Sequence, residues 1–176
     1  MKERNSLIGN FLAFLALEVV LSGFQTAFWT HVTPFATSPR FWLFGFAYVA
    51  LYRPLTQGVI FSYINTLLLA GFTNMPIGIL LALHMIVLSV TVFIRKRIFW
   101  PTLTYFITTC LSLNILFSIS FFLLSWSSEP MRSQELDWRE LFASLVLAPL
   151  ITPVVFKIGR GIDRVFPAPT TGVSQS

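Results

Sequence analysis

The sequence predicts an all-α, polytopic membrane protein with six transmembrane helical elements and both termini in the cytoplasm. Two observations lead to this fold class. Of the 176 residues, 55% are hydrophobic and only 11% are charged, and the mean hydropathy is +0.76. The apolar residues also gather in long stretches, and a hydrocarbon core about 30 Å thick needs roughly 20 such residues in a helix. Soluble domains have about a quarter of their residues charged, so this chain is not suited to water.

Each of six apolar segments is expected to form one helical element. They are Leu7–Thr26, Phe41–Tyr52, Val59–Phe72, Ile77–Ile94, Leu103–Trp126 and Leu141–Ile158. The first continues to the aromatic Phe28 and Trp29 and lacks a small-residue cleavage site, so we expect a retained helix and not a signal peptide. No repeat or linker divides the chain. We therefore predict a single six-helix membrane domain over residues 1–166 and a disordered cytoplasmic tail over residues 167–176, which lacks an apolar run.

The second and third segments are short, and Arg53-Pro54 lies between them. The rival interpretation is one helix over Phe41–Phe72 that is kinked at the proline. Charge decides between the two, because cytoplasmic loops carry the excess of Lys and Arg. Five crossings would put the basic cluster Arg95–Arg97 outside, whereas six crossings put only Arg40, Arg132 and Arg139 there. On the cytoplasmic side, six crossings place Lys2, Arg4, Arg53, Arg95, Lys96, Arg97, Lys157, Arg160 and Arg164.

Two ionisable side chains fall within the apolar segments and are candidates for function. Glu18 lies two-thirds of the way along the first segment, where an ionised carboxylate costs several kcal/mol unless it is paired or hydrated. Two interpretations of Glu18 are equally good. Its carboxyl group could carry the function, or it could be protonated or hydrogen-bonded and join the first helix to a neighbouring one. His84 lies midway along the fourth segment among apolar neighbours. We expect it to be neutral and hydrogen-bonded to another helix, in preference to a ligand or proton carrier.

Other positions favour helix packing. Asn65 offers a polar contact between helices, usually worth about 1 kcal/mol or less. Pro76 suits the first turn of the fourth helix, and Gly78 would let a neighbouring backbone come close. Close approach by the transmembrane helices of partner proteins is also expected at small residues, namely Gly45, Ala47, Gly58, Ala70 and Gly71.

The basic residues at the cytoplasmic helix ends predict a rim that contacts lipid headgroups. The rim residues are Arg53, Arg95, Lys96, Arg97, Lys157 and Arg160. Arg53 is expected to snorkel to the headgroups, and anionic lipid could hold each basic residue with about 1 kcal/mol. These cations are dispersed between apolar segments, so nucleic acid is not an expected partner.

No pattern in the chain indicates catalysis or a metal. Cys110 is the single cysteine, and His31 has no His, Cys or carboxylate at the spacing of metal ligands. Most acids gather in the connection Ser127–Glu140. Neither a Ser-His-Asp arrangement nor an HExxH, GxGxxG or Walker pattern is present. We therefore expect no enzymatic activity, no metal and no cofactor, and an intramembrane enzyme or ion channel is the least favoured function.

Three stretches carry a resemblance to a known family. Pro39, Tyr48 and Pro54 lead to the Pro76-Ile77-Gly78 turn, and the basic cluster Arg95–Arg97 closes the fourth helix. The third stretch is the ending from Pro149 to Phe166, with its prolines and basic exit. In this order they resemble the bacterial rod shape-determining protein MreD family. The sequence departs from that family in the third helix, where many relatives carry an Asp and Asn65 to Gly71 contains no acid.

The resemblance implies a non-enzymatic component of the cell-elongation machinery in the bacterial cytoplasmic (inner) membrane. Its implied partners are a scaffold protein like MreC, the actin-like MreB and the peptidoglycan synthases, besides membrane lipid. The alternative is the substrate-binding membrane subunit of a vitamin transporter of the energy-coupling-factor type. That function would use an outward-facing polar pocket, for which Trp29, His31, Arg40 and the Ser127–Glu140 connection are candidates.

Overall fold

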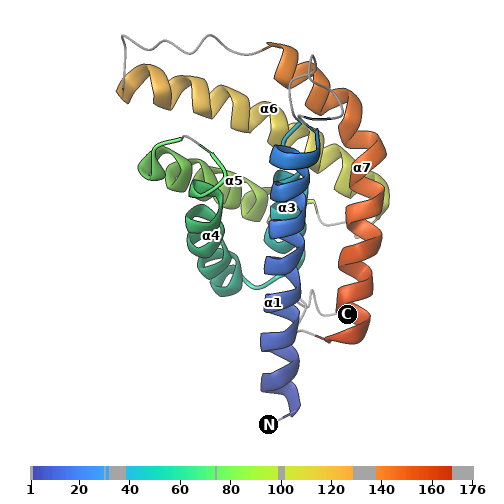
Figure 1. Ribbon diagram of the computed structural model, residues 1–176. Coiled ribbons are helices and arrows are strands. Elements are labelled where there is room, and N and C mark those ends of the chain that lie inside the picture. Colours follow the sequence, from blue (N-terminus) through green and yellow to red (C-terminus); the bar gives the residue numbers. More distant parts are fainter. Residues whose placement is uncertain are drawn as a thin grey trace.

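The computed structural model is all-helical and describes residues 2–29, 31, 39–73, 75–98, 102–128 and 138–167 (Figure 1). The helices are α1 (Lys2–Gly23), α3 (Trp42–Tyr52), α4 (Leu55–Ala70), α5 (Ile77–Arg97), α6 (Leu103–Ser128) and α7 (Trp138–Val165). A π-helical segment, η1 (Phe24–Trp29), directly continues α1. The described residues thus form six helical elements, in the places where the apolar segments predicted them.

The helix α3 lies at the centre of the bundle. The other five helices all contact it, and they contact one another in the closed order α1, α4, α5, α6, α7 and back to α1. All 11 residues of α3 are buried. Its sequence explains this position, because WLFGFAYVALY has no polar face to turn toward water, and a helix that is apolar all round is buried on every side.

The chain reverses direction between α3 and α4. Arg53 is extended, with φ −110° and ψ 157°, and Pro54 starts α4 without needing an amide hydrogen. Phe46 of α3 then packs against Phe61 of α4, with 6.3 Å between ring centroids. The two helices therefore form a hairpin, and the rival single kinked helix over residues 41–72 is wrong.

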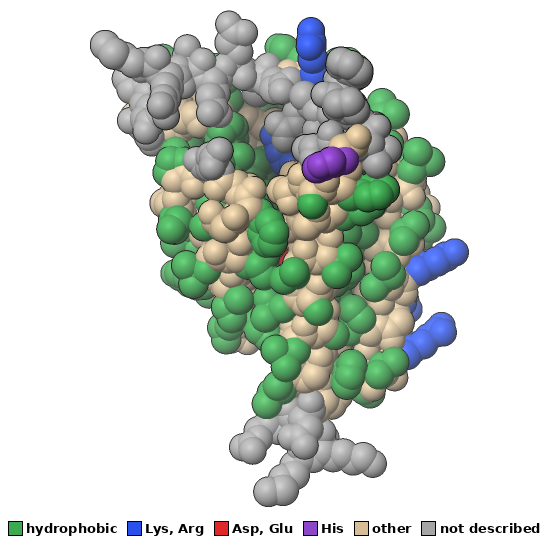
Figure 2. Space-filling view, viewed as in Figure 1, with side chains coloured by type: hydrophobic (Ala, Val, Ile, Leu, Met, Phe, Trp, Pro, Cys, Tyr) green, Lys and Arg blue, Asp and Glu red, His purple; other side chains and the backbone are tan. Residues whose placement is uncertain are grey.

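Four of the helical elements are long and apolar enough to cross a membrane: Ser6–Trp29, Ile77–Arg97, Leu103–Ser127 and Leu141–Val165. The other two are shorter, since α3 has 11 residues and α4 has 16, or about 16 and 24 Å at the usual rise. Large apolar side chains also cover much of the outer face that carries α1 (Figure 2). Composition and surface together make this a membrane protein.

The start of α1 and the end of α7 lie at the same end of the bundle (Figure 1). Ser6 Oγ donates to the Pro167 carbonyl at 2.6 Å, and Asn10 Nδ2 donates to the Phe166 carbonyl at 2.8 Å. We call this end, where α3 and α5 also finish, the inner end. Most of the predicted tail (168–176) and of the acidic connection (129–137) lies outside the described residues.

Packing of α7 against α3 requires glycine at position 159. A methyl group there would lie 2.7 Å from two ring carbons of Tyr48, whereas nothing lies within 4 Å of a methyl group at Gly161. We expect Gly159→Ala to lower the free energy of unfolding by about 1–3 kcal/mol through overpacking. Gly161→Ala, on the same helix, should be neutral or stabilise by about 0.5–1 kcal/mol. Thermal unfolding of both variants in the same detergent measures the difference, and equal behaviour would contradict this packing.

Candidate functional site

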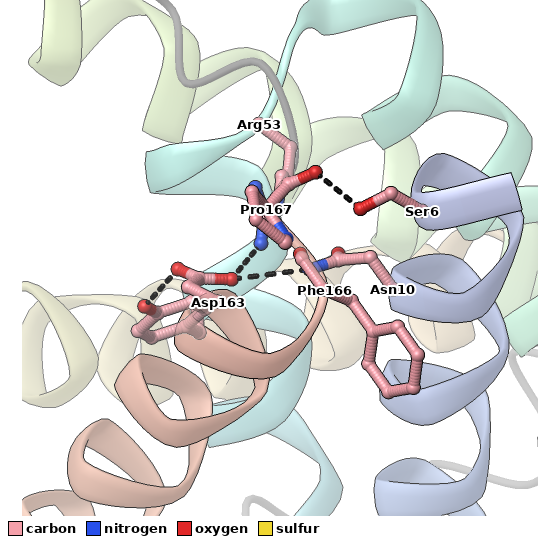
Figure 3. A network of polar contacts seen from close by, with 7 residues as sticks. Ser6, Asn10, Arg53, Asp163, Phe166 and Pro167 are labelled. Atoms are coloured by element: carbon pink, nitrogen blue, oxygen red, sulfur yellow. Dashed lines mark hydrogen bonds and ion pairs between the residues drawn. The ribbon is translucent and has the colours of Figure 1, made fainter. Parts of the chain in front are cut away.

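A network of polar side chains joins three parts of the bundle at the inner end (Figure 3). Arg53, at the α3–α4 junction, forms an ion pair with Asp163 of α7. The hydroxyl of Tyr48 donates to Asp163 Oδ2 at 2.7 Å, and Asn10 Nδ2 of α1 donates to Oδ1 at 3.2 Å. A carboxylate that accepts several hydrogen bonds beside a guanidinium is well stabilised, so Asp163 fixes α1 and α7 to the end of α3.

Arg95 of α5 completes the inner end by covering the last carbonyls of α3. Its Nη1 donates to the Arg53 carbonyl at 2.5 Å, and also lies 3.3 and 3.4 Å from the carbonyls of Ala50 and Leu51. The last carbonyls of a helix have no partner within the helix, and a cation there also interacts favourably with the helix dipole. Arg95 therefore supplies a hydrogen-bond donor and a positive charge at the buried C-terminal end of α3.

These contacts correct the predicted role of Arg53. The side chain was expected to reach the lipid headgroups, but it is only 2% exposed and points into the bundle. It does so because Asp163 offers a charged partner at the same level, which the sequence pattern did not reveal. Of the predicted rim, Lys96, Arg97, Lys157 and Arg160 are exposed at the inner end, whereas Arg53 is buried and Arg95 is half-buried against the carbonyls of α3.

The structure brings together two of the predicted polar residues, Asn65 of α4 and His84 of α5. His84 Nδ1 lies 2.8 Å from the Leu80 carbonyl, which can only accept, so Nδ1 carries the hydrogen. Nε2 is then the acceptor for Asn65 Nδ2 at 3.2 Å. The imidazole also stacks on Trp42 and meets the edge of Phe46, both on α3. This is the arrangement of a neutral histidine that joins three helices, as its apolar surroundings predicted.

Glu18 lies at the interface of α1 with α3, in contact with Gly45. A methyl group at position 45 would come within 2.5 Å of Glu18 Oε1, so glycine makes room for the carboxyl group. Glu18 is 1% exposed, and none of the described residues hydrogen-bonds to either of its oxygens. Ser22, one turn further along α1, is equally buried, and its hydroxyl oxygen has no described partner either. The interface therefore holds polar atoms that do not contribute to its stability.

The remaining predicted packing positions divide into buried and exposed ones. Gly45, Ala47 and Gly58 are buried inside the bundle, so they serve its own packing and are closed to partner helices. Pro76 precedes α5 as expected, but Gly78 is exposed with nothing within 4 Å of an added methyl group. Within the described bundle no backbone comes close to Gly78, because it lies on the outward side of the first turn of α5, whereas Leu80 of the same turn is fully buried.

At the opposite end, Arg40 lies buried beside the start of α3. Its Nη1 donates to Ser118 Oγ of α6 at 2.7 Å, and its guanidinium lies 4.6 Å from the centre of the Phe117 ring. Gln25 Oε1 accepts the backbone N–H of Phe41 at 3.1 Å, which supplies a partner at the start of the helix. Of the other residues expected in the pocket of a transporter subunit, Trp29 packs against Phe41 and His31 is exposed, while most of the Ser127–Glu140 connection lies outside the described residues.

Sequence reasoning missed Asp163 and the buried role of Arg40. A signal for Asp163 was present, since it is the single acid among the closely spaced cations Lys157, Arg160 and Arg164. An acid in such a basic segment often has a specific cationic partner. Nothing in the sequence indicated which arginine that partner would be.

Neither a metal site nor a family assignment emerges from these residues. Among the described residues, no group of three or more His, Cys, Asp or Glu side chains could hold a metal ion. No family model, curated protein or solved structure matches the chain. The resemblance to the MreD family therefore stays a prediction from the sequence.

Removal of Asp163 tests the inner-end network. We expect Asp163→Leu to destabilise the protein by about 3–5 kcal/mol, because it leaves the buried guanidinium of Arg53 without a counter-charge. The double variant Arg53→Met with Asp163→Leu should regain much of that loss, since replacing both charges by apolar groups is often neutral. Thermal unfolding of the two single variants and the double variant measures the coupling. Additive losses would show that the two side chains do not depend on each other.

Substitution of Glu18 tests whether its carboxyl group stabilises the bundle. We expect Glu18→Met to raise the free energy of unfolding by about 1–3 kcal/mol, because it removes a buried polar group that has no described partner. Glu18→Gln keeps the shape and the polar atoms, so it should stay close to the parent protein. A large loss of thermal stability in Glu18→Met would mean that the carboxyl group has a stabilising partner.

Proposed function

We propose that this protein is a non-enzymatic component of the bacterial cell-elongation (rod-shape, peptidoglycan synthesis) machinery in the cytoplasmic membrane. It binds a single transmembrane helix of an MreC-like scaffold protein, and through that contact the peptidoglycan-synthesis proteins. The sequence resemblance supplies the biological setting of this proposal. The observation that carries the binding mode is an outward stripe of side chains on α4.

This α4 stripe consists of Thr56, Ile60, Tyr63 and Leu67, all exposed. Their spacing of four, three and four residues is the one by which two helices interlock along a common seam. The exposed fractions of Ile60, Tyr63 and Leu67 are 53%, 52% and 66%. The buried residues between them face the rest of the bundle, where Asn65 meets His84 of α5 and Phe61 packs against Phe11 of α1 and Phe46 of α3. The α4 stripe therefore does not pack against the other helices of the bundle.

Two properties of α4 favour a protein partner over lipid alone. With 16 residues the helix is about 24 Å long, less than a hydrocarbon core of about 30 Å, and lipid must deform to match it. The hydroxyl group of Tyr63 also sits halfway along the helix, where hydrocarbon offers no hydrogen-bond partner. A partner helix would cover both the short flank and this hydroxyl group.

Most buried polar side chains have partners inside the bundle, with exceptions such as Glu18 and Ser22, and this favours a binding role over a chemical one. His84 and Asn65 bind each other, Arg53 binds Asp163, and Arg95 covers the end of α3. Groups held in this way have structural duties in the interior. The outer surfaces of the helices are left to carry the function.

Six crossings with both termini in the cytoplasm also belong to this proposal. Reporter fusions of the phosphatase and fluorescent-protein type test it at three positions. Fusions after Phe72, Arg97 and Glu135 should report outside, inside and outside. Any other order would contradict six alternating crossings, and with it the cytoplasmic position of the inner end.

The binding mode predicts different effects of the same substitution on two helices. Leu67→Trp on the α4 stripe should reduce recovery of the scaffold protein about tenfold or more on affinity purification from native bacterial membranes, because a bulkier side chain disrupts the seam. Leu150→Trp on α7 is the matched control, since Leu150 is 67% exposed and Leu67 is 66% exposed. Mass spectrometry of the co-purified proteins provides the measurement.

Equal recovery with both variants would contradict the α4 seam. Recovery of an ATPase pair with a coupling subunit, or of a stoichiometric vitamin, would overturn the elongation role altogether. That second outcome would favour the transporter subunit instead. Thermal unfolding of each variant shows that a loss of partner is not a loss of fold.

A further inference from the structure

We propose that Glu18 and Ser22 of α1 form a binding site for a sodium ion at the interface with α3. The two residues are one helical turn apart, so their side chains lie on the same side of α1. Both residues are 1% exposed. Neither oxygen of the Glu18 carboxyl group nor the hydroxyl oxygen of Ser22 has a hydrogen-bond partner among the described residues. Three oxygen atoms are therefore available to a ligand inside the bundle.

A buried carboxylate needs a positive charge beside it, because the interior does not solvate it as water does. The helices that contact α1 are α3, α4 and α7. Neither α3 nor α4 contains a charged residue, and the Lys and Arg side chains of α7 are exposed. The cations of α1 itself, Lys2 and Arg4, lie about four turns before Glu18. The charge must therefore come from a proton or a bound cation.

The arrangement of the oxygens favours a cation over a proton. Glu18 and Ser22 do not hydrogen-bond to each other, so a proton on the carboxyl group joins none of the three oxygens, whereas a cation can contact all of them. Carboxylate and hydroxyl oxygens suit hard cations, and softer metals prefer Cys and His. Such an ion does not need the group of three His, Cys, Asp or Glu side chains that the described residues lack.

Charge and packing favour sodium among the hard cations. One carboxylate balances one positive charge, so a divalent cation would leave an uncompensated charge in the interior. A methyl group at position 45 would lie 2.5 Å from Glu18 Oε1 and 3.2 Å from Leu21 Cδ1, so the interface is tight and suits sodium better than the larger potassium ion. Because Oε1 lies against the backbone of α3, an ion bound there joins α1 to α3.

A bound ion also explains why this interface holds polar atoms at all. Buried polar groups without partners destabilise a fold, and such departures from ordinary packing are typical of functional sites. The π-helical η1 begins at Phe24, directly after this pair, and π-helical turns are frequent at functional sites. The site lies inside the bundle, so it is independent of the role proposed for the α4 stripe.

Modification by dicyclohexylcarbodiimide, an apolar reagent that reacts with protonated carboxyl groups, tests the site in the purified full-length protein. Sodium displaces the proton and should protect Glu18, whereas potassium at the same ionic strength should not. With sodium at ten times its dissociation constant, the rate of modification at Glu18, followed by mass spectrometry, should fall about tenfold. Sodium should also raise the melting temperature of the parent protein and leave that of Glu18→Met unchanged.

Two matched serine variants test the second ligand. Ser22→Ala keeps the carboxyl group, so Glu18 should still be modified, but sodium should bind about tenfold more weakly. Ser62→Ala is the control, because Ser62 is also buried and its hydroxyl group donates to the Gly58 carbonyl within α4. Sodium should protect this variant as it protects the parent protein. Melting temperatures in potassium buffer show that each variant is folded.

Three results would overturn the proposal. Equal rates of modification in sodium and potassium would mean that Glu18 binds only a proton. A melting temperature of the parent protein that does not rise with sodium would count against the site even where the reagent does not reach Glu18. An equal loss of protection in Ser22→Ala and Ser62→Ala would mean that Ser22 is not a ligand.

Discussion

The short helix α3 has no face toward water or lipid, so the other helices must satisfy its backbone ends. A helix leaves its first N–H groups and its last carbonyls without partners, and burying such groups is costly. Gln25 of the α1 extension accepts from Phe41 at one end, and Arg95 of α5 donates to three carbonyls at the other. The positions of η1 and of the end of α5 are therefore tied to α3.

The same constraint explains where the charged residues are. Burying the charge of Arg53 or Arg95 without a partner would cost free energy. At the inner end of α3, Arg53 pairs with the carboxylate of Asp163, and Arg95 donates hydrogen bonds to backbone carbonyls. Asp163 in turn brings α7 to Tyr48, and the missing side chain of Gly159 allows their contact. Two cations that a charge count assigns to the membrane surface thus hold the bundle together, while the exposed Lys96, Arg97 and Lys157 stay outside it.

The proposed contact with a partner protein lies on an outward face of the ring. The interior is filled by aromatic and aliphatic side chains packed around α3 and by polar pairs such as Asn65 with His84. The α4 stripe differs from a plain lipid-facing surface in its spacing and its tyrosine.

Composition and hydropathy alone determined that the chain is a helical membrane protein with six elements, because burial in lipid demands long apolar runs whatever the partners of each helix are. The neutral, hydrogen-bonded state of His84 also followed from its apolar neighbours. Pairing was a different matter. That Arg53 meets Asp163, 110 residues away, depends on which helices become neighbours. Apolar segments of similar composition do not encode that order, so the central place of α3, the internal use of Gly45 and Gly58 and the outward α4 stripe were decided only by the tertiary structure.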